Sequence, residues 1–235
     1  MRISKLSLTS SAQHYTLSDK ALCPVSEVRD LGIHLDDKIF FASHYKKISS
    51  KAYSRAYLVL KSFVSNDPIL LVKAFCVYVR SLLEFSTQLW NPQKKIDILL
   101  IERVQKYFTR KVCKRCKISY SDYSSRLDQL NLNSLERRRL IFDLTFMYKI
   151  FHGLVDVPIT DFFSRPIVAH STRGHSYKVC LTGRANCNVR AHFFNYRIIN
   201  VWNSLPESIV NASSLASFKS KIREFDVSSF CKLFP

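Results

Sequence analysis

Asp36 and Asp37 are the only pair of adjacent carboxylates in the sequence. In a polymerase, two such aspartates on a turn can hold the Mg²⁺ ions that align an incoming nucleotide with a primer hydroxyl. That site needs a third carboxylate on a neighbouring strand, and the flanking segment 33–38 supplies none. We therefore interpret the pair as a solvated turn that leads into a helix.

Cys113 and Cys116 have the spacing of half a zinc site, which Cys180 and Cys187 could complete. The second pair is more widely spaced and lies far along the chain. The seven cysteines are an odd number and make a poor disulfide framework. We interpret them as ordinary thiols of a reducing compartment, the cytoplasm or the nucleus, with a zinc site as the alternative.

Other catalytic signatures are missing from the sequence. It contains no Gly-x-Ser-x-Gly elbow and no His-Glu-x-x-His motif, and its 4 glycines are too few for the familiar phosphate-binding loops. We therefore expect no complete active site, no cofactor, no bound metal and no small-molecule substrate.

The charge of the chain favours a polyanionic partner. The sequence has 36 Lys and Arg against 18 Asp and Glu, a formal net charge of +18, and residues 162–206 contain no acidic residue. Nucleic acid is the first candidate and an anionic membrane surface the second. No apolar stretch approaches the roughly 18 residues that cross a bilayer, and the first residues do not form a signal peptide, so we expect no membrane anchor.

Basic and aromatic residues alternate in segments 103–110 and 190–197. Basic groups neutralise phosphates, and aromatic faces can stack on exposed bases. For Phe193, Phe194 and Trp202 a place in the core is the better interpretation, because aromatic side chains are mostly buried. The basic residues are therefore the better candidates for contact.

The elements that must position these residues are mainly helical. Hydrophobic residues make up 47% of the chain, and their spacing predicts short strands at 15–17 and 28–35, the second interrupted by Gly32. Helices are expected over 45–63, 68–85, 95–112 and 121–130, then from Asn133 to a stop at Gly153, and finally from Ser213 or Ser214. We expect helix 68–85 to be the buried centre of a bundle, and residues 162–206 to be irregular with short strands.

Many short motifs, in order and over nearly the whole chain, resemble one family. The first group is Asp30-Leu-Gly-Ile33, Phe41-x-x-His44, Tyr78-Val-Arg-Ser-Leu-Leu-Glu-Phe85, Trp90, Leu100-Ile-Glu-Arg-Val-Gln-Lys-Tyr-Phe-Thr-Arg110 and Tyr148-Lys-Ile-Phe-His-Gly153. The second is Thr172-Arg-Gly-His175, Asn188-Val-Arg190, Phe193-Phe194, Arg197, Asn200-Val-Trp-Asn-Ser-Leu-Pro206 and Phe218-Lys219. Together they resemble the region after the palm of jockey-like, LINE-type non-LTR retrotransposon reverse transcriptases, which are RNA-directed DNA polymerases.

The resemblance implies a fragment in three parts. Residues 1–40 would contain a hairpin in which Leu31 and Gly32 grip the primer terminus. Residues 41–155 would form a helical, thumb-like bundle, and residues 156–235 a basic C-terminal region with a terminal helix. The catalytic Tyr/Phe-x-Asp-Asp box, the fingers and the endonuclease of the family lie upstream, so we expect no polymerisation by this chain alone; the missing palm and fingers would be its partners in a longer chain.

On this basis we expect binding of RNA or an RNA/DNA duplex through the sugar-phosphate backbone, with little reading of base sequence. The expected backbone contacts are Lys47, Lys51, Arg103, Lys106 and Arg110. The expected contacts to template RNA are Arg173, Arg184, Arg190 and Arg197. The alternatives are a basic helical module that docks on a protein or a membrane, and a non-functional product of a truncated element.

Overall fold

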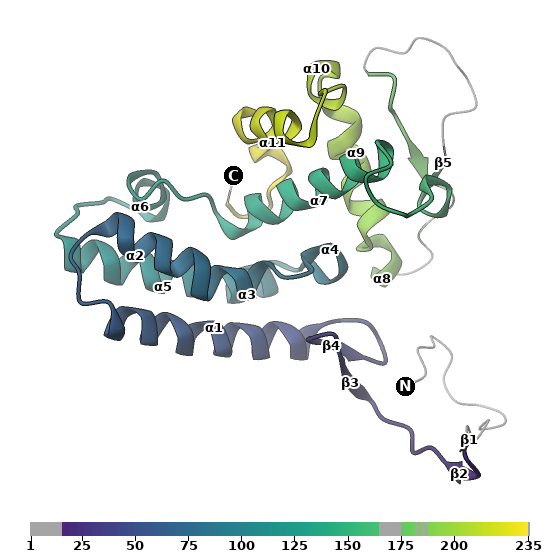
Figure 1. The fold of residues 1–235 in the computed structure, drawn as a ribbon, viewed down its shortest axis with the longest axis horizontal. Coiled ribbons are helices and arrows are strands. Elements are labelled where there is room, and N and C mark those ends of the chain that lie inside the picture. The colour runs from purple at the N-terminus through teal and green to yellow at the C-terminus, as the bar shows by residue number, and fades with distance from the viewer. Residues whose placement is uncertain (1–15, 165–174, 182, 184, 186–187, 235) are drawn as a thin grey trace.

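The computed structural model describes residues 16–164, 175–181, 183, 185 and 188–234, and it confirms a mainly α-helical chain with short antiparallel strand pairs (Figure 1). The longer helices are α1 (Ala42–Ser62), α2 (Pro68–Phe75), α5 (Lys95–Cys116), α6 (Tyr123–Gln129), α7 (Leu135–Phe151), α9 (Phe194–Ser204) and α11 (Leu215–Glu224). Shorter helical segments are η1 (Cys76–Arg80), α3 (Ser81–Glu84), α4 (Thr87–Trp90), η2 (Ile159–Asp161), α8 (Asn188–Ala191), α10 (Glu207–Val210) and η3 (Ser228–Phe230). The strand pairs are β1 (Thr16–Leu17) with β2 (Lys20–Ala21), β3 (Glu27–Asp30) with β4 (Ile33–Asp36), and β5 (Phe163–Ser164) with β6 (Cys180–Leu181).

The predicted strand over residues 28–35 is wrong, because this segment is a hairpin. Strands β3 and β4 pair antiparallel and are joined by Leu31 and Gly32, whose φ angles are 44° and 89°. A two-residue hairpin turn with positive φ at both positions matches the twist of its strands, and glycine adopts that conformation without strain. Gly32 therefore reverses the chain instead of interrupting one strand.

Helices α1, α2–η1–α3 and α5 lie side by side and share one core (Figure 1). The second begins as predicted, since Pro68 is its first residue and the Asp67 carboxylate accepts a hydrogen bond from the Ile69 amide at 2.8 Å. Between α2 and α3 the chain forms the π-helical turn η1. The predicted single helix is therefore continuous to Glu84, with this local change of pitch.

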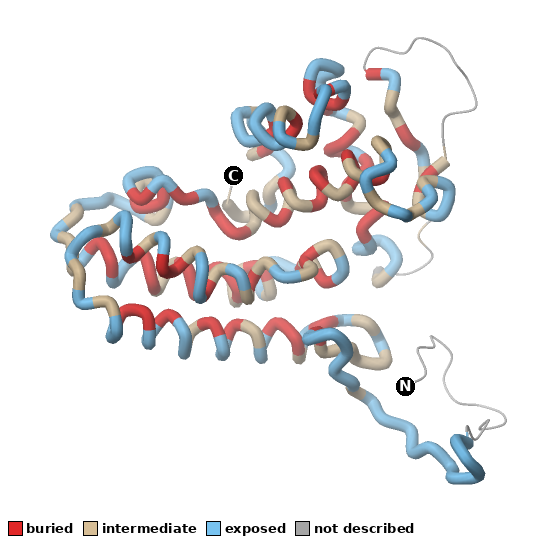
Figure 2. The backbone as a smooth tube through the Cα atoms, viewed as in Figure 1, coloured by how far each residue is buried: buried red, intermediate tan, exposed pale blue. Residues whose placement is uncertain are grey.

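The prediction that residues 68–85 form the buried centre of a bundle is wrong. Leu71, Phe75 and Leu83 are buried, but Val77 and Tyr78 are exposed on the other side. Figure 2 shows α1 and α2 each buried along one side and exposed along the other. This helix is consequently a flank of the bundle.

Helices α1 and α5 run parallel, which brings their first turns together. The Tyr45 hydroxyl, in the first turn of α1, donates to the Trp90 carbonyl just before α5 at 2.8 Å. At the other end, the Arg115 guanidinium donates to the Leu60 and Phe63 carbonyls, each at 2.6 Å. The contact between these helices is consequently continuous along their length.

Helix α7 begins one residue later than the predicted capping box. The Ser134 hydroxyl accepts from the Arg137 amide at 3.1 Å, so Ser134 is the cap in place of Asn133. Glu136 does not complete a box, because its carboxylate accepts from the amides of residues 232–234 at 2.7–3.0 Å. The end of α7 follows the prediction, since Gly153 has a φ of 61°.

A second core lies between α7, α9 and α11, with Trp202 and Phe218 fully buried in it. It starts within α7, at Ile141. The prediction of an irregular segment over 162–206 is wrong for residues 194–204, which form α9. The last helix is capped by Ser214, one of the two predicted residues.

Candidate nucleic-acid interface

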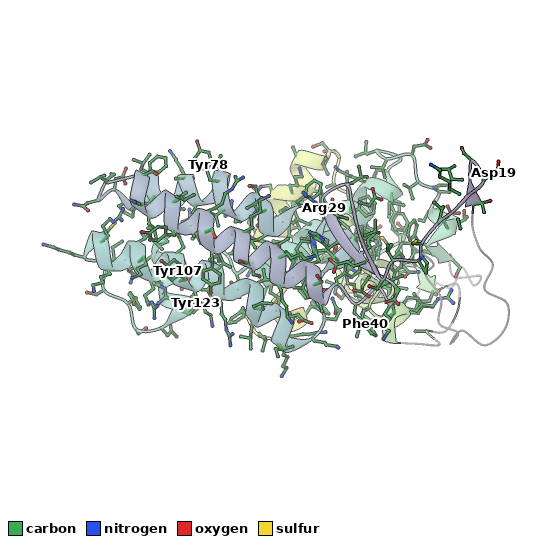
Figure 3. The ribbon with its side chains drawn as sticks, turned by 90° about the horizontal axis from the view of Figure 1, so that it is seen from below. Asp19, Arg29, Phe40, Tyr78, Tyr107 and Tyr123 are labelled. Carbon is green, nitrogen blue, oxygen red and sulfur yellow. The ribbon has the colours of Figure 1, made fainter. Side chains whose placement is uncertain are left out.

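The exposed seam between α1 and α5 combines tyrosines with basic residues. The rings of Tyr53 and Tyr107 meet edge to face with their centroids 5.6 Å apart. We define the α1–α5 face by these residues and their exposed neighbours along the two helices: Tyr53, Tyr57, Arg103, Tyr107, Arg110 and Lys111. Figure 3 shows Tyr107 on one side of α1 and Tyr78 on the other, so this face is distinct from the apolar flank of η1.

Arg103 and Arg110 are the unpaired cations of this face. They are two helical turns apart on α5, and both are exposed. Among the residues described by the structure, neither guanidinium makes a hydrogen bond or an ion pair. Burial raises the pKa of Tyr53, and the positive charges of Arg103 and Arg110 oppose that rise. Their charge is therefore available to phosphates.

Lys106 belongs to the same stripe of α5 but leans toward α6 and the C-terminal segment. Its ammonium lies 4.8 Å from the ring centroid of Tyr123 and 4.4 Å from that of Phe234. Such cation–π contacts stabilise the charge in place by roughly 0.5–1 kcal/mol at exposed sites. Lys106 thus has partners within the chain, unlike Arg103 and Arg110.

A buried carboxylate on α5 fixes the elements around Lys106. Glu102 is fully buried, and it accepts from the Leu135 amide at the start of α7 and from the Tyr123 hydroxyl of α6. Burial raises the pKa of Glu102, while the hydrogen bond from Tyr123 opposes the rise. This network holds the Tyr123 ring where Lys106 contacts it.

Lys47 and Lys51 lie on a different face of α1. The Lys47 ammonium contacts the Glu27 carboxylate and lies 3.2 Å from His34 Nδ1, which ties α1 to the β3–β4 hairpin. Lys51 follows one turn later and is exposed. Side chains two positions apart on a helix do not face each other, so Lys51 points away from Tyr53. The five predicted backbone contacts are therefore not on one surface.

The predicted RNA contacts of the C-terminal region also separate. Arg190 is exposed in α8. Arg197 is largely buried and forms a two-pronged ion pair with Asp143, at 2.8 and 3.0 Å, and donates to the Gln88 and His192 carbonyls. Arg197 is therefore a structural residue, and we do not retain it as an RNA contact. Arg173 and Arg184 lie outside the described residues.

Leu31 and Gly32 form the tip of the β3–β4 hairpin. The Leu31 side chain is 86% exposed, and a Cβ atom at Gly32 would lie 3.9 Å from Phe85. The hairpin is anchored to α1 by a 3.3 Å hydrogen bond from the His34 amide to His44 Nδ1. Its tip is consequently held at a fixed position next to α3.

Asp36 has a structural role in the turn before α1. Its carboxylate accepts from the amides of Lys38, Phe40 and Phe41 at 2.9–3.2 Å. Asp36 is the last residue of β4 and Asp37 begins the turn that leads to α1, so the interpretation of the pair as a turn is confirmed for Asp37 and wrong for Asp36. Within the described ranges, no group of three or more His, Cys, Asp or Glu side chains is arranged to hold a metal ion.

The cysteines singled out in the sequence lie in unrelated places. Cys113 is buried and Cys116 half-buried at the end of α5, and burial raises the pKa of both thiols. Cys180 is exposed in β6, and Cys187 falls outside the described residues. In the part of the chain that the structure describes, no helix combines the length and apolar character needed to cross a membrane.

Sequence reasoning missed Tyr53, Tyr57 and Lys111. The signal was available, because Tyr53 and Tyr57 are four residues apart and therefore neighbours on one helix flank. The sequence alone does not show that this flank packs against Tyr107 of α5.

Comparisons with known proteins identify one relative. No model of a known protein family matches the sequence, and no solved structure matches the chain. The uncharacterized protein B0403.1 of Caenorhabditis elegans is 32% identical over 133 residues, which cover 57% of this chain and 67% of the worm protein. The chain therefore belongs to the same protein family as this C. elegans protein.

Proposed function

We propose that the chain is the thumb and post-thumb region of a jockey-like non-LTR reverse transcriptase and binds RNA or an RNA/DNA duplex through the α1–α5 face. The observation that carries the proposal is the position of Arg103 and Arg110, which are exposed and unpaired within the described residues, beside Tyr53 and Tyr107. The resemblance of the sequence motifs to that family supports the same assignment.

The mechanism is neutralisation of phosphates by a rigid surface. Helix α5 has 22 residues and is about 33 Å long, comparable with one turn of a duplex. Arginines spaced along it would each displace condensed counterions from the backbone, and the tyrosine edges would contact sugars. Such a surface recognises the shape and charge of a duplex rather than its sequence.

The hairpin supplies a second proposed contact. Leu31 projects from a tip that His44 and Lys47 hold against α1. The matching residues of the reverse transcriptases contact the primer terminus, and we assign the same role to Leu31 and Gly32. Asp36 is engaged by three backbone amides, so we assign it no catalytic role and propose that the chain does not polymerise by itself.

The salt dependence of binding tests this proposal. Replacing Arg103 and Arg110 with glutamine should weaken binding of a blunt RNA/DNA hybrid and flatten the log–log salt slope by about 2 units, because two phosphate contacts are lost. The matched control is Lys73→Gln with Lys219→Gln, which removes the same charge from exposed positions on α2 and α11. Equal slopes for the two double variants would show that the α1–α5 face does not bind the duplex.

One observation favours a second candidate, a membrane-binding module. Leu70, Val77 and Tyr78 expose apolar surface on α2 and η1, with Lys73 between them. An apolar strip with adjacent positive charge suits the surface of an anionic bilayer. Flotation with phosphatidylserine vesicles that is lost in Val77→Ser, without any duplex binding, would favour this candidate.

A further inference from the structure

A cleft opens at the end of the bundle where α1 and α5 begin. It is lined by the link between β4 and α1, by the segment from α4 to the first turn of α5, and by the link between α8 and α9. The cleft is partly open to solvent, and its cavity volume is about 80 Å³. Segments far apart in the sequence therefore form one concave surface.

Two exposed phenylalanines line this cleft. Phe40 is 49% exposed and Phe193 is 42% exposed, although both are large apolar side chains. The Phe193 ring lies nearly parallel to that of Phe162, with a centroid distance of 6.4 Å. Exposed phenyl faces at a cleft are suited to stacking on a planar ring, and base–aromatic stacking tolerates every base.

The cleft also contains a carboxylate without a partner. Asp97 lies in the first turn of α5, and its side chain makes no hydrogen bond or ion pair within the described residues. The amides beside it are occupied, since Asn91 binds Asp143 and Arg139, and Gln93 accepts from Lys232. Asp97 is thus the free acceptor of the cleft, and carboxylates accept hydrogen bonds from the exocyclic amino groups of bases.

A lysine lies at the rim. The Lys94 side chain lines the cleft, and its ammonium lies 5.5 Å from the Phe40 ring centroid. This ammonium is placed to neutralise a phosphate whose base enters the cleft. Stacking faces, an acceptor and a cationic rim together match a single nucleotide.

The cleft continues the α1–α5 face. Asp97 precedes Arg103 on α5, and Tyr45 in the first turn of α1 lines the same cleft. Figure 3 shows Phe40 at the end of α1, on the side of the helix where Tyr107 lies. A duplex lying along that face would have its end directed at the cleft.

We propose that this cleft holds the first unpaired nucleotide beyond the end of a duplex bound on the α1–α5 face, with a preference for bases that carry an exocyclic amino group. The inference rests on the duplex binding proposed above. The base stacks on Phe40 and Phe193, its amino group donates to Asp97, and its phosphate lies near Lys94.

The experiment compares a blunt RNA/DNA hybrid with the same hybrid carrying one overhanging C or U, using fluorescence anisotropy. A cytosine overhang should raise the affinity about tenfold, because one base is stacked. Phe40→Ala or Phe193→Ala should abolish this gain and leave the affinity for the blunt hybrid unchanged. Asp97→Asn should remove the preference for cytosine over uracil. The control is Phe230→Ala, which removes an exposed phenylalanine elsewhere.

A second measurement separates failure of the cleft from failure of duplex binding. Trp90 lines the cleft, so titration with cytidine monophosphate should quench tryptophan fluorescence, and Phe193→Ala should prevent the quenching. Quenching without hybrid binding would refute the proposed function and retain the nucleotide site. Two results would overturn the site. One is that the hybrid binds but the cytosine overhang still raises the affinity in both folded variants, Phe40→Ala and Phe193→Ala. The other is that cytidine monophosphate does not quench the tryptophan fluorescence.

Discussion

His44 makes the stability of the fold sensitive to mild acid. His44 is buried, with only 2% of its surface exposed, and its ring packs against the indole of Trp90 with a centroid distance of 5.0 Å. Nδ1 accepts from the His34 amide, while Nε2 has no partner within the described residues. Burial, reinforced by the positive charges of His34 and Lys47, lowers the pKa of His44 from 6.5 to about 4.

The direction of the effect follows from proton binding. Between pH 6.5 and 4 the unfolded chain binds a proton at residue 44 and the folded chain does not, so the free energy of unfolding falls as the pH falls. The full difference of about 2.5 pKa units corresponds to about 3 kcal/mol, of which about 2 kcal/mol is lost by pH 5. Above pH 7 neither state binds this proton, so His44 causes no loss of stability there.

Urea unfolding followed by circular dichroism at pH 7 and pH 5 measures this loss. His44→Phe keeps an aromatic ring against Trp90 but cannot titrate, so its stability should fall by about 2 kcal/mol less than that of the wild type. The control Tyr45→Phe removes the hydrogen bond to the Trp90 carbonyl. Its free energy of unfolding should be about 1 kcal/mol lower than that of the wild type at both pH values. If the wild type and His44→Phe lose the same stability on acidification, His44 is not the neutral buried group described here.

Two further predictions concern the basic residues. Arg197→Met leaves the buried Asp143 carboxylate unpaired and should reduce the free energy of unfolding by about 3–5 kcal/mol. The double variant Arg197→Met with Asp143→Leu should regain much of this stability. A single variant that unfolds at the same temperature as the wild type would refute a structural role for the pair. Because the Phe234 and Tyr123 rings engage Lys106, Lys106→Gln should change the salt slope of duplex binding less than Arg103→Gln does. The difference should narrow in a Phe234→Ala background, where only the Tyr123 ring remains. Equal slopes in the wild-type background would contradict this contact.

Local signals predicted much of the helical framework. Asp67 with Pro68, Ser214 and Gly153 mark helix ends through hydrogen bonds and φ angles within a few residues, so their effect does not depend on the rest of the chain. Gly32 was misinterpreted as interrupting a single strand, because glycine occurs both inside irregular strands and in two-residue turns. Only the pairing of Asp30 with Ile33 distinguishes them.

Burial of the second helix could not be predicted from its own sequence. Residues 68–85 are apolar on most sides, which is typical of a central helix. The chain places neighbours on only one flank, so Val77 and Tyr78 remain exposed. The same limit applied to α9, whose aromatic and basic residues suit a helix only once α7 and α11 cover one side of it.

Composition and short-range spacing were sufficient to predict the mainly helical class, the strong positive charge and the alternation of basic and aromatic residues. Which basic residues have partners depends instead on long-range packing. Arg197 meets Asp143 from 54 positions away and Lys106 meets the Phe234 ring, whereas Arg103 and Arg110 lie unpaired among the described residues beside Tyr53 of another helix. Ion pairs and ring contacts require separations of a few ångströms, and only the packing of distant segments sets those separations.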